Sequence, residues 1–244
     1  MKAFAVIGFS KSGKTTLIEQ IIKELKNRGH SVATVKHIHG GKSIDLKEKD
    51  TRRHINAGAE LTIALSDSET LEIRPLKTEL WKILWRLSNY DFVVLEGFKK
   101  MFYGVKIAVA RNLQEAKDLL DSLTIAFTGK LAEDVEEVDG IPVVSNVKTL
   151  VDLVEEKAFT PPAGFNCGEC GYENCKKMAI AILENKARIE DCLYMGSKVR
   201  LIVNEYEVKL NPFTSLVFKN VIMGLVNSLK GVESPREVKI EIRL

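Results

Sequence analysis

Short apolar runs alternate with segments of helical periodicity along the first 156 residues of the chain. Such runs are typical of buried parallel strands, and they predict strands at residues 3–7, 31–36, 60–65, 91–95, 105–110, 123–127 and 141–145. Apolar residues three and four positions apart predict helices, at residues 17–25, 76–87 and 147–156, and a short helix is expected at residues 51–57 after Asp50. Strands and helices that alternate in this way predict an α/β protein with a doubly wound, mostly parallel sheet.

The pattern changes at residues 160–164, Thr-Pro-Pro-Ala-Gly, a stiff connection that a helix does not cross. We expect one domain before it, residues 1–158, and two smaller parts after it. Residues 164–196 contain every cysteine of the chain. Residues 197–244 have the pattern of a ββαβ tail, with a hairpin, a helix that begins at Pro212 and a final alternating strand. The tail has no catalytic signature, so we expect it to serve in docking or to complete the core of the cysteine module.

Residues 8–16 read Gly-Phe-Ser-Lys-Ser-Gly-Lys-Thr-Thr and match G-x-x-x-x-G-K-[ST] at every position. A predicted strand precedes them and a predicted helix follows, as this phosphate-binding loop requires. The backbone N–H groups of such a loop and the dipole of its helix bind anions. We expect Lys14 to reach the β- and γ-phosphates of a nucleoside triphosphate and Thr15 to ligate Mg²⁺. The predicted nucleotide-binding residues are Gly8, Ser10, Lys11, Ser12, Gly13, Lys14, Thr15, Thr16 and, from a later strand, Gly97.

The apolar strand at residues 91–95 ends in Glu96-Gly97, which is typical of a Walker B strand. An acid there lies beside the phosphate loop, where it binds Mg²⁺ through water or orients an attacking water. Gly97 would let the backbone approach the terminal phosphate. Asp45 follows another strand, at the sheet edge where open α/β proteins bind ligands. The predicted catalytic residues are Lys14, Glu96 and Asp45, and the predicted magnesium ligands are Thr15, Asp45 and Glu96.

A long polar stretch, residues 36–54, holds three of the four histidines. They are His37, His39 and His54. Their spacing fits no tetrahedral metal site, so we favour solvated or phosphate-facing histidines over metal ligands. Asp50 is expected to cap a short helix, from which Arg52 or Arg53 faces either a phosphate or solvent.

The cysteines follow the spacing C-x2-C-x4-C-x16-C, with Gly168 and Gly171 placed to let the backbone wrap closely. They are Cys167, Cys170, Cys175 and Cys192. In a reducing compartment such thiols indicate a metal site or cluster rather than disulfides. Zinc sites more often show a second C-x2-C pair, so a 4Fe-4S cluster is favoured over zinc. The segment is similar to the small four-cysteine cluster domain of electron-transfer subunits and corrinoid iron–sulfur proteins.

The composition is that of an ordinary soluble globular protein. The 36 basic and 33 acidic residues leave a net charge of +3, which is too balanced to indicate a nucleic-acid partner. No apolar run reaches the length of a membrane-spanning helix, and no signal peptide precedes the first strand. We expect a cytoplasmic protein with neither a nucleic-acid nor a membrane partner.

Spacing alone does not choose GTP over ATP, because no segment shows the N-K-x-D pattern of a guanine-binding loop. A family resemblance bears on the choice. The phosphate loop, Val35-Lys36-His37, Ala57-Gly58-Ala59, the segment 91–99 and Lys106-Ile107 together resemble the MobB family of molybdopterin-guanine dinucleotide biosynthesis. The resemblance covers about residues 1–155 and implies a GTP-binding protein with weak GTPase activity. It implies a MobA-like nucleotidyltransferase or a molybdopterin enzyme as the partner, and leaves a homodimer open.

Two other classes of function stay open at this point. One is a metallochaperone NTPase that delivers a metal or electrons to a client protein. The other is a P-loop kinase that phosphorylates a small molecule, which needs an acceptor pocket with a positioned general base. The sequence reveals no such base.

Overall fold

The structure is a computed structural model that describes residues 1–38, 49–192, 194–195, 199, 201–204, 206–208, 210, 212–232, 235, 238–240 and 242. The chain divides into two compact units, Met1–Ala158 and Phe159–Leu244. None of the helices in this described part of the chain is both long and apolar enough to cross a membrane.

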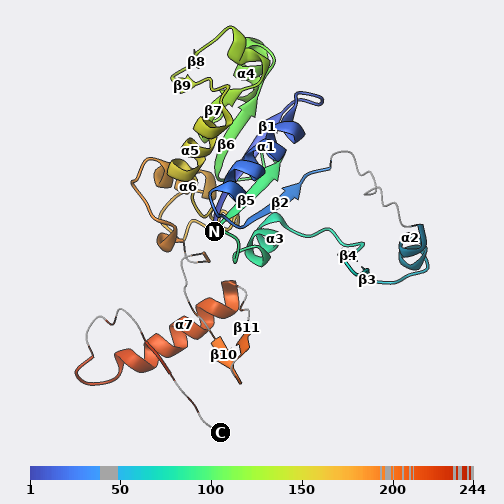
Figure 1. Ribbon diagram of the computed structural model, residues 1–244. Helices are drawn as coiled ribbons and strands as arrows, with labels where there is room; N and C mark the ends of the chain where they lie inside the picture. Colours follow the sequence, from blue (N-terminus) through green and yellow to red (C-terminus); the bar gives the residue numbers. More distant parts are fainter. Residues whose placement is uncertain are drawn as a thin grey trace. The chain divides into compact units, whose positions relative to one another are not determined.

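The first unit is built on a five-stranded sheet, in which each neighbouring pair of strands is parallel. Its order is β2 (Val32–Lys36), β5 (Phe92–Glu96), β1 (Lys2–Gly8), β6 (Val105–Val109) and β7 (Thr124–Thr128). Because β1, β5, β6 and β7 are almost wholly buried, they are continuous apolar runs rather than alternating ones. The predicted α/β, doubly wound architecture is confirmed (Figure 1).

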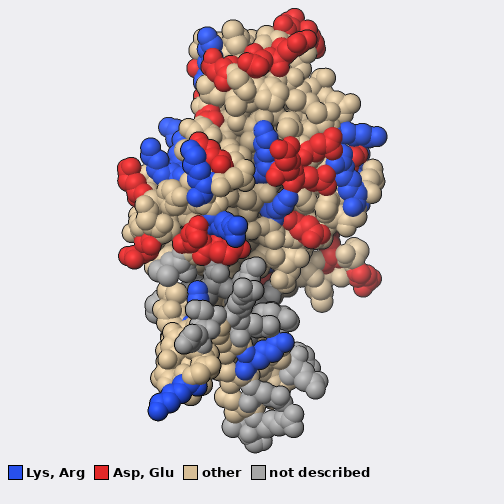
Figure 2. All heavy atoms as spheres, turned by 90° about the vertical axis from the view of Figure 1, so that its left-hand side faces the viewer, with Lys and Arg blue, Asp and Glu red and all other residues tan. Residues whose placement is uncertain are grey.

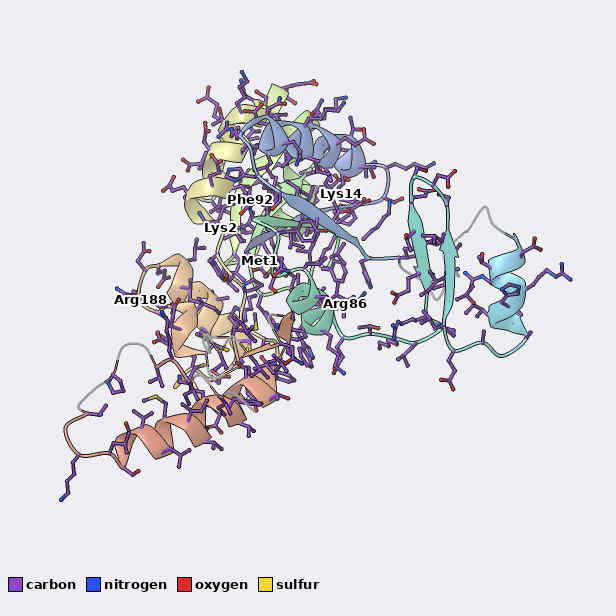
Figure 3. The ribbon with its side chains drawn as sticks, turned by 60° about the horizontal axis from the view of Figure 1, so that its bottom comes forward. Met1, Lys2, Lys14, Arg86, Phe92 and Arg188 are labelled. Carbon is purple, nitrogen blue, oxygen red and sulfur yellow. The ribbon has the colours of Figure 1, made fainter. Side chains whose placement is uncertain are left out.

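Four helices belong with this sheet. They are α1 (Lys14–Asn27), α3 (Leu80–Arg86), α4 (Leu113–Leu119) and α5 (Val147–Lys157). Leu84 of α3 and Leu119 of α4 share one core cluster with alternate residues of β1, Ala3, Ala5 and Ile7. Helices α1 and α5 pack against each other, and Arg28 after α1 pairs with Asp152 and Glu155 of α5 at 2.6 Å. Figure 3 shows Lys2 near Phe92, its register partner on β5.

Two segments predicted to be strands of the parallel sheet do not belong to it. The segment 60–65 contains β3 (Thr62–Leu65), which pairs antiparallel with β4 (Thr70–Ile73) in a separate hairpin. Its apolar residues Ile63 and Leu65 are 56% and 81% exposed, so the pattern did not mark a buried strand. The segment 141–145 contributes only β9 (Ile141–Pro142), which pairs antiparallel with β8 (Glu137–Val138), and one parallel bridge from Val143 to Phe127. Pro142 has no N–H to donate to a longer ladder.

One helix prediction needs correction, and one helix was missed. The helix expected at residues 76–87 spans only Leu80–Arg86. Helix α4 was not predicted, although Asn112 caps it by accepting a hydrogen bond from the Glu115 N–H at 2.9 Å. In a seven-residue helix too few positions repeat for periodicity to be visible.

The described residues of the second unit form two helices, a 3-10 turn and a hairpin. They are α6 (Cys175–Leu183), a 3-10 turn (Ile189–Asp191), the antiparallel hairpin β10 (Leu201–Val203) and β11 (Tyr206–Val208), and α7 (Pro212–Asn227). The predicted hairpin and helix of the tail are present. The strand expected at residues 238–244 is not seen in its described part, residues 238–240 and 242. Ala163, Met178 and Cys192 are buried in one cluster.

Candidate functional site

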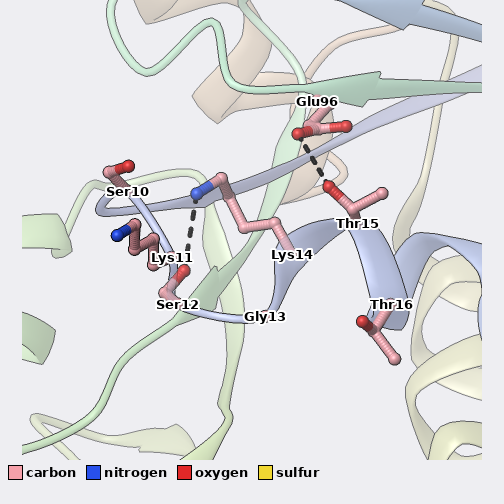
Figure 4. A pocket seen from close by; sticks show the side chains of 8 residues that line it. All are labelled: Ser10, Lys11, Ser12, Gly13, Lys14, Thr15, Thr16 and Glu96. Atoms are coloured by element: carbon pink, nitrogen blue, oxygen red, sulfur yellow. Dashed lines mark hydrogen bonds between the residues drawn. The ribbon is translucent and has the colours of Figure 1, made fainter.

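The residues between β1 and α1 line a pocket of about 340 Å³ (Figure 4). Its walls come from the loop between β1 and α1, from the first three residues of α1 and from the end of β5, the strand beside β1. The lining residues are Ser10, Lys11, Ser12, Gly13, Lys14, Thr15, Thr16 and Glu96. The predicted loop residues and the predicted Walker B acid therefore share one pocket.

Glycine is required at two loop positions. Gly13 has φ of 91° immediately before the first residue of α1, a conformation that residues with a Cβ rarely adopt. At Gly8, the last residue of β1, an added Cβ would lie 2.6 Å from Ser12 Oγ and 2.7 Å from the carbonyl oxygen of Val109. The loop folds back so tightly that only glycine fits at its base.

One carboxylate oxygen of Glu96 contacts both the hydroxyl of Thr15 and the ammonium of Lys36. The hydroxyl of Thr15 donates a hydrogen bond to Glu96 Oε1 at 3.1 Å. Lys36 Nζ lies 3.2 Å from the same oxygen, because β2 and β5 pair with Lys36 directly opposite Glu96. A hydroxyl and a carboxylate at this separation are oxygen ligands of the type that Mg²⁺ prefers.

The ammonium of Lys14 lies inside the loop. Its Nζ donates to the carbonyl of Phe9 and is 3.4 Å from Ser12 Oγ. Burial lowers the pKa of Lys14, the charge of Glu96 raises it, and the charges of Lys99 and Lys36 lower it further. Several positive charges thus surround the loop, and an anion bound there would relieve their repulsion.

Two hydrogen bonds fix the segment that follows Glu96, one from the backbone N–H of Gly97 and one from the buried side chain of Lys106. The N–H of Gly97 donates to the carbonyl of Val6 at 2.9 Å, and Gly97 is not among the pocket-lining residues. Its contact with a terminal phosphate stays a prediction. Lys106, buried in β6, donates from Nζ to the carbonyl of Lys99 at 2.9 Å. Lys99 Nζ lies 4.0 Å from the ring centroid of Phe9, so this segment also contacts the phosphate loop.

Sequence reasoning missed the positions of Lys36 and Lys99 in this site. The apolar pattern finds strands but does not say which strands are neighbours, and the contact of Lys36 with Glu96 depends on β2 lying beside β5. Lys99 carried a weak signal, because it follows a Walker B strand by three positions.

The other polar residues predicted to belong to the site are not among the described residues that line the pocket. Asp45 and His39 lie outside the described residues. Asp50 lies inside α2 (Lys49–Asn56), not before it, so its predicted N-cap role is wrong. Arg53 pairs with Asp50 at 3.3 Å with both side chains 81% exposed, and neither Arg52 nor Arg53 lines the pocket.

The surface of the first unit carries both charges. Figure 2 shows basic and acidic side chains interleaved over much of one face, with acidic side chains gathered at its upper end. Five exposed acids lie in or close to β8 and β9 along the chain, Glu133, Asp134, Glu136, Glu137 and Asp139.

The four cysteines form a second candidate site, in the second unit. Cys192 is buried with Met178, and Cys170 packs against the same cluster. Burial raises the pKa of the Cys175 thiol, hydrogen bonds from the backbone of Asn166 and Gly164 lower it, and the charges of Cys192 and Cys167 raise it. Cys170 and Cys192 therefore share one small apolar core, whereas Cys175 is buried outside that cluster and Cys167 is exposed.

The donor set fits an iron–sulfur cluster. All four cysteines are free, and the loop between the first three turns at Gly168 and Gly171, with φ of 77° and 81°. Within the described residues, no group of three or more His, Cys, Asp or Glu side chains is arranged to hold a metal ion. The sulfurs would therefore have to close further around a cluster as it binds.

Comparison with known proteins identifies the chain. Residues 3–129 match the family model "Molybdopterin guanine dinucleotide synthesis protein B", known as MobB. The chain is also 34% identical, over 99% of its length and 97% of the relative's, to a protein of Methanocaldococcus jannaschii. The chain belongs to the MobB family.

One relative matches both parts of the chain, and other similarities cover the MobB part or the cysteine module alone. The Methanocaldococcus relative is named "Putative molybdopterin-guanine dinucleotide biosynthesis adapter protein". A Bacillus subtilis protein named as a probable adapter of the same kind is 32% identical over 57% of this chain and 82% of its own. Residues 163–194 match a second family model, "Putative Fe-S cluster".

Solved MobB structures agree with the fold of the first unit. The crystal structure of Bacillus subtilis MobB has a TM-score of 0.56 and 29% identity, and covers 65% of this chain and 99% of its own. Another, titled molybdopterin-guanine biosynthesis protein B, has a TM-score of 0.51 and 28% identity, and covers 63% of this chain and 97% of its own. The MobB resemblance predicted from the sequence is confirmed.

Proposed function

We propose that this MobB-family chain is a GTP-binding adapter protein in the biosynthesis of molybdopterin guanine dinucleotide. The observation that carries the proposal is the contact of Thr15 with Glu96 in a pocket otherwise lined by the phosphate loop. The adapter role follows from the names of its relatives. Slow GTP hydrolysis is part of the proposal.

The roles of the residues follow from the pocket. Lys14 and the backbone N–H groups of the loop are proposed to bind the phosphates, because Lys14 lines the pocket and loops of this motif bind anions through their N–H groups. Thr15 and Glu96 hold Mg²⁺, which would neutralise charge that develops on the phosphates during hydrolysis. Asp45, outside the described residues, stays a predicted further ligand. Among the residues that the structure describes, no arginine lines the pocket, so a partner protein is expected to supply one if hydrolysis is accelerated.

The four cysteines are proposed to hold one 4Fe-4S cluster. Four thiolates complete the ligand set of a cubane, and the apolar core formed with Met178 limits solvent access to it. Replacing Cys175 with serine should remove the iron from anaerobically prepared protein and leave GTP binding intact. Stoichiometric zinc without iron in the parent protein would contradict this part of the proposal.

The proposed partner is a MobA-like nucleotidyltransferase or a molybdopterin enzyme, reached in the cytoplasm, where four free thiols are stable. The test is formation of molybdopterin guanine dinucleotide by such a transferase with and without this chain. We expect the wild-type protein to increase the rate or yield of this reaction. The Lys14→Ala protein should increase it little or not at all. Phosphoryl transfer from ATP to a small acceptor, with no effect on the transferase, would favour the kinase alternative instead.

A further inference from the structure

Asn166 and Cys175 are joined by two hydrogen bonds, in each of which the backbone N–H of one residue donates to a side-chain atom of the other. The N–H of Asn166 donates to Cys175 Sγ at 3.3 Å. The N–H of Cys175 donates to the side-chain oxygen Oδ1 of Asn166 at 2.9 Å. Asn166 immediately precedes Cys167, so this one residue ties the turn that carries the first cysteine to the helix that begins with the third.

The backbone of Asn166 is in an uncommon conformation. Its φ is 52°, in the left-handed region, where asparagine is tolerated better than most residues with a Cβ. That conformation accompanies the N–H···S hydrogen bond. Asn166 is itself exposed, so burial does not account for an asparagine at this position.

Asn174 provides a natural comparison. It also immediately precedes a cysteine, and its side chain also accepts one backbone hydrogen bond, from the N–H of Lys177 at 2.9 Å. This bond caps α6 and does not involve a sulfur. The two asparagines therefore differ in whether they contact a predicted cluster ligand.

We propose that Asn166 is a positioning residue of the cluster, which fixes Cys175 relative to Cys167 and supplies a hydrogen bond to the Cys175 sulfur. This role rests on the proposed 4Fe-4S cluster. A donor at a ligand sulfur withdraws negative charge and favours the reduced cluster, which carries one more electron, so the bond raises the midpoint potential. Holding two ligand-bearing segments together also slows loss of iron.

The test compares three single variants of the full chain with the parent, all prepared without oxygen. Asn166→Ala loses the amide oxygen and the tolerance for positive φ, whereas Asn166→Gly loses only the amide oxygen. Asn174→Ala is the matched control. The midpoint potential is measured by redox titration, and Fe–S(Cys) stretching bands are recorded by resonance Raman spectroscopy, which needs no reduction of the cluster.

We expect Asn166→Ala to shift the midpoint potential to more negative values and the Fe–S(Cys) bands to higher frequency. Asn166→Gly should lie between this variant and the parent, and it carries the test if the alanine variant retains no iron. Asn174→Ala should match the parent in both measurements. Parent-like values in both Asn166 variants, or an equal shift in Asn174→Ala, would overturn the role of Asn166. Parent protein that holds zinc and no iron would contradict the cluster itself and with it the basis of this inference.

Discussion

The hydroxyl of Thr15 meets the carboxylate of Glu96 at 3.1 Å, although 81 positions separate the two residues in the chain. The contact follows from the parallel pairing of β1 with β5, which brings Val6 opposite Glu96 at the edge where the phosphate loop begins. Lys36 reaches the same carboxylate oxygen from the other side of β5. A divalent cation bound between Thr15 and Glu96 would therefore compete with the Lys36 ammonium.

Glu96→Gln is predicted to impair hydrolysis more than binding. The amide keeps the size of the side chain but loses the charge that would hold Mg²⁺ and orient water. We expect the rate of GTP hydrolysis to fall by about a hundredfold, the lower end of what positioned acid–base groups contribute, while the Kd for GTP changes by only a few-fold. The measurement is phosphate release at saturating GTP and Mg²⁺. Glu19→Gln, an exposed substitution on α1, is the control, and a parent rate in Glu96→Gln would remove Glu96 from the mechanism.

Gly8→Ala is predicted to destabilise the first unit. The new Cβ would lie 2.7 Å from the backbone oxygen of Val109 in β6, so the loop or β6 must shift. Overpacking of this kind costs about 1–3 kcal/mol in the free energy of unfolding. Gly224→Ala, in α7 with no atom within 4 Å of the new Cβ, should instead be neutral or stabilise by up to about 1 kcal/mol. Chemical denaturation of both variants checks the contrast, and equal effects would show that the loop tolerates a side chain at Gly8.

Acid should weaken the contact between α1 and α5. Hydrogen bonds from His30 and Arg28 lower the pKa of Glu155 below its ordinary value of 4.5. The folded state therefore binds fewer protons at this group than the unfolded state, and the stability it contributes is present above pH 4.5 and is lost as the pH falls through the lower, folded-state pKa.

Glu155→Gln should accordingly flatten the dependence of unfolding free energy on pH in that acid range. The exposed neighbour Glu156 provides the control substitution, Glu156→Gln, which should leave the pH dependence unchanged. Parallel pH profiles for the parent and Glu155→Gln would show that the ion pairs of Arg28 and His30 contribute no stability.

The local features of the site could be predicted from the sequence, because each is a short motif with a strand or helix beside it. Gly8, Lys14 and Thr15 belong to one loop, and Glu96 ends one apolar run. Pairing between distant strands is not encoded in such runs. The run at residues 62–65 resembles a sheet strand, yet it pairs with residues 70–73 in a hairpin that leaves Ile63 and Leu65 exposed.

In the second unit, too, local features could be predicted from the sequence and contacts between separate segments could not. Asn174 and Pro212 mark the starts of α6 and α7 through capping chemistry that acts within one turn. The bonds between Asn166 and Cys175 had no sequence signal, since they depend on a left-handed backbone at a residue other than glycine.

Calorimetric titration of the full chain with GTP and with ATP, in the presence of Mg²⁺, tests the central claim most directly. We expect GTP to bind more tightly than ATP. Lys14→Ala should lower the affinity for GTP by about tenfold to a hundredfold, because the substitution removes a charge-assisted contact worth about 1.5–3 kcal/mol. Lys23→Ala, exposed on the same helix, should bind like the parent. Unchanged GTP affinity in Lys14→Ala, or a parent protein that prefers ATP, would contradict the account.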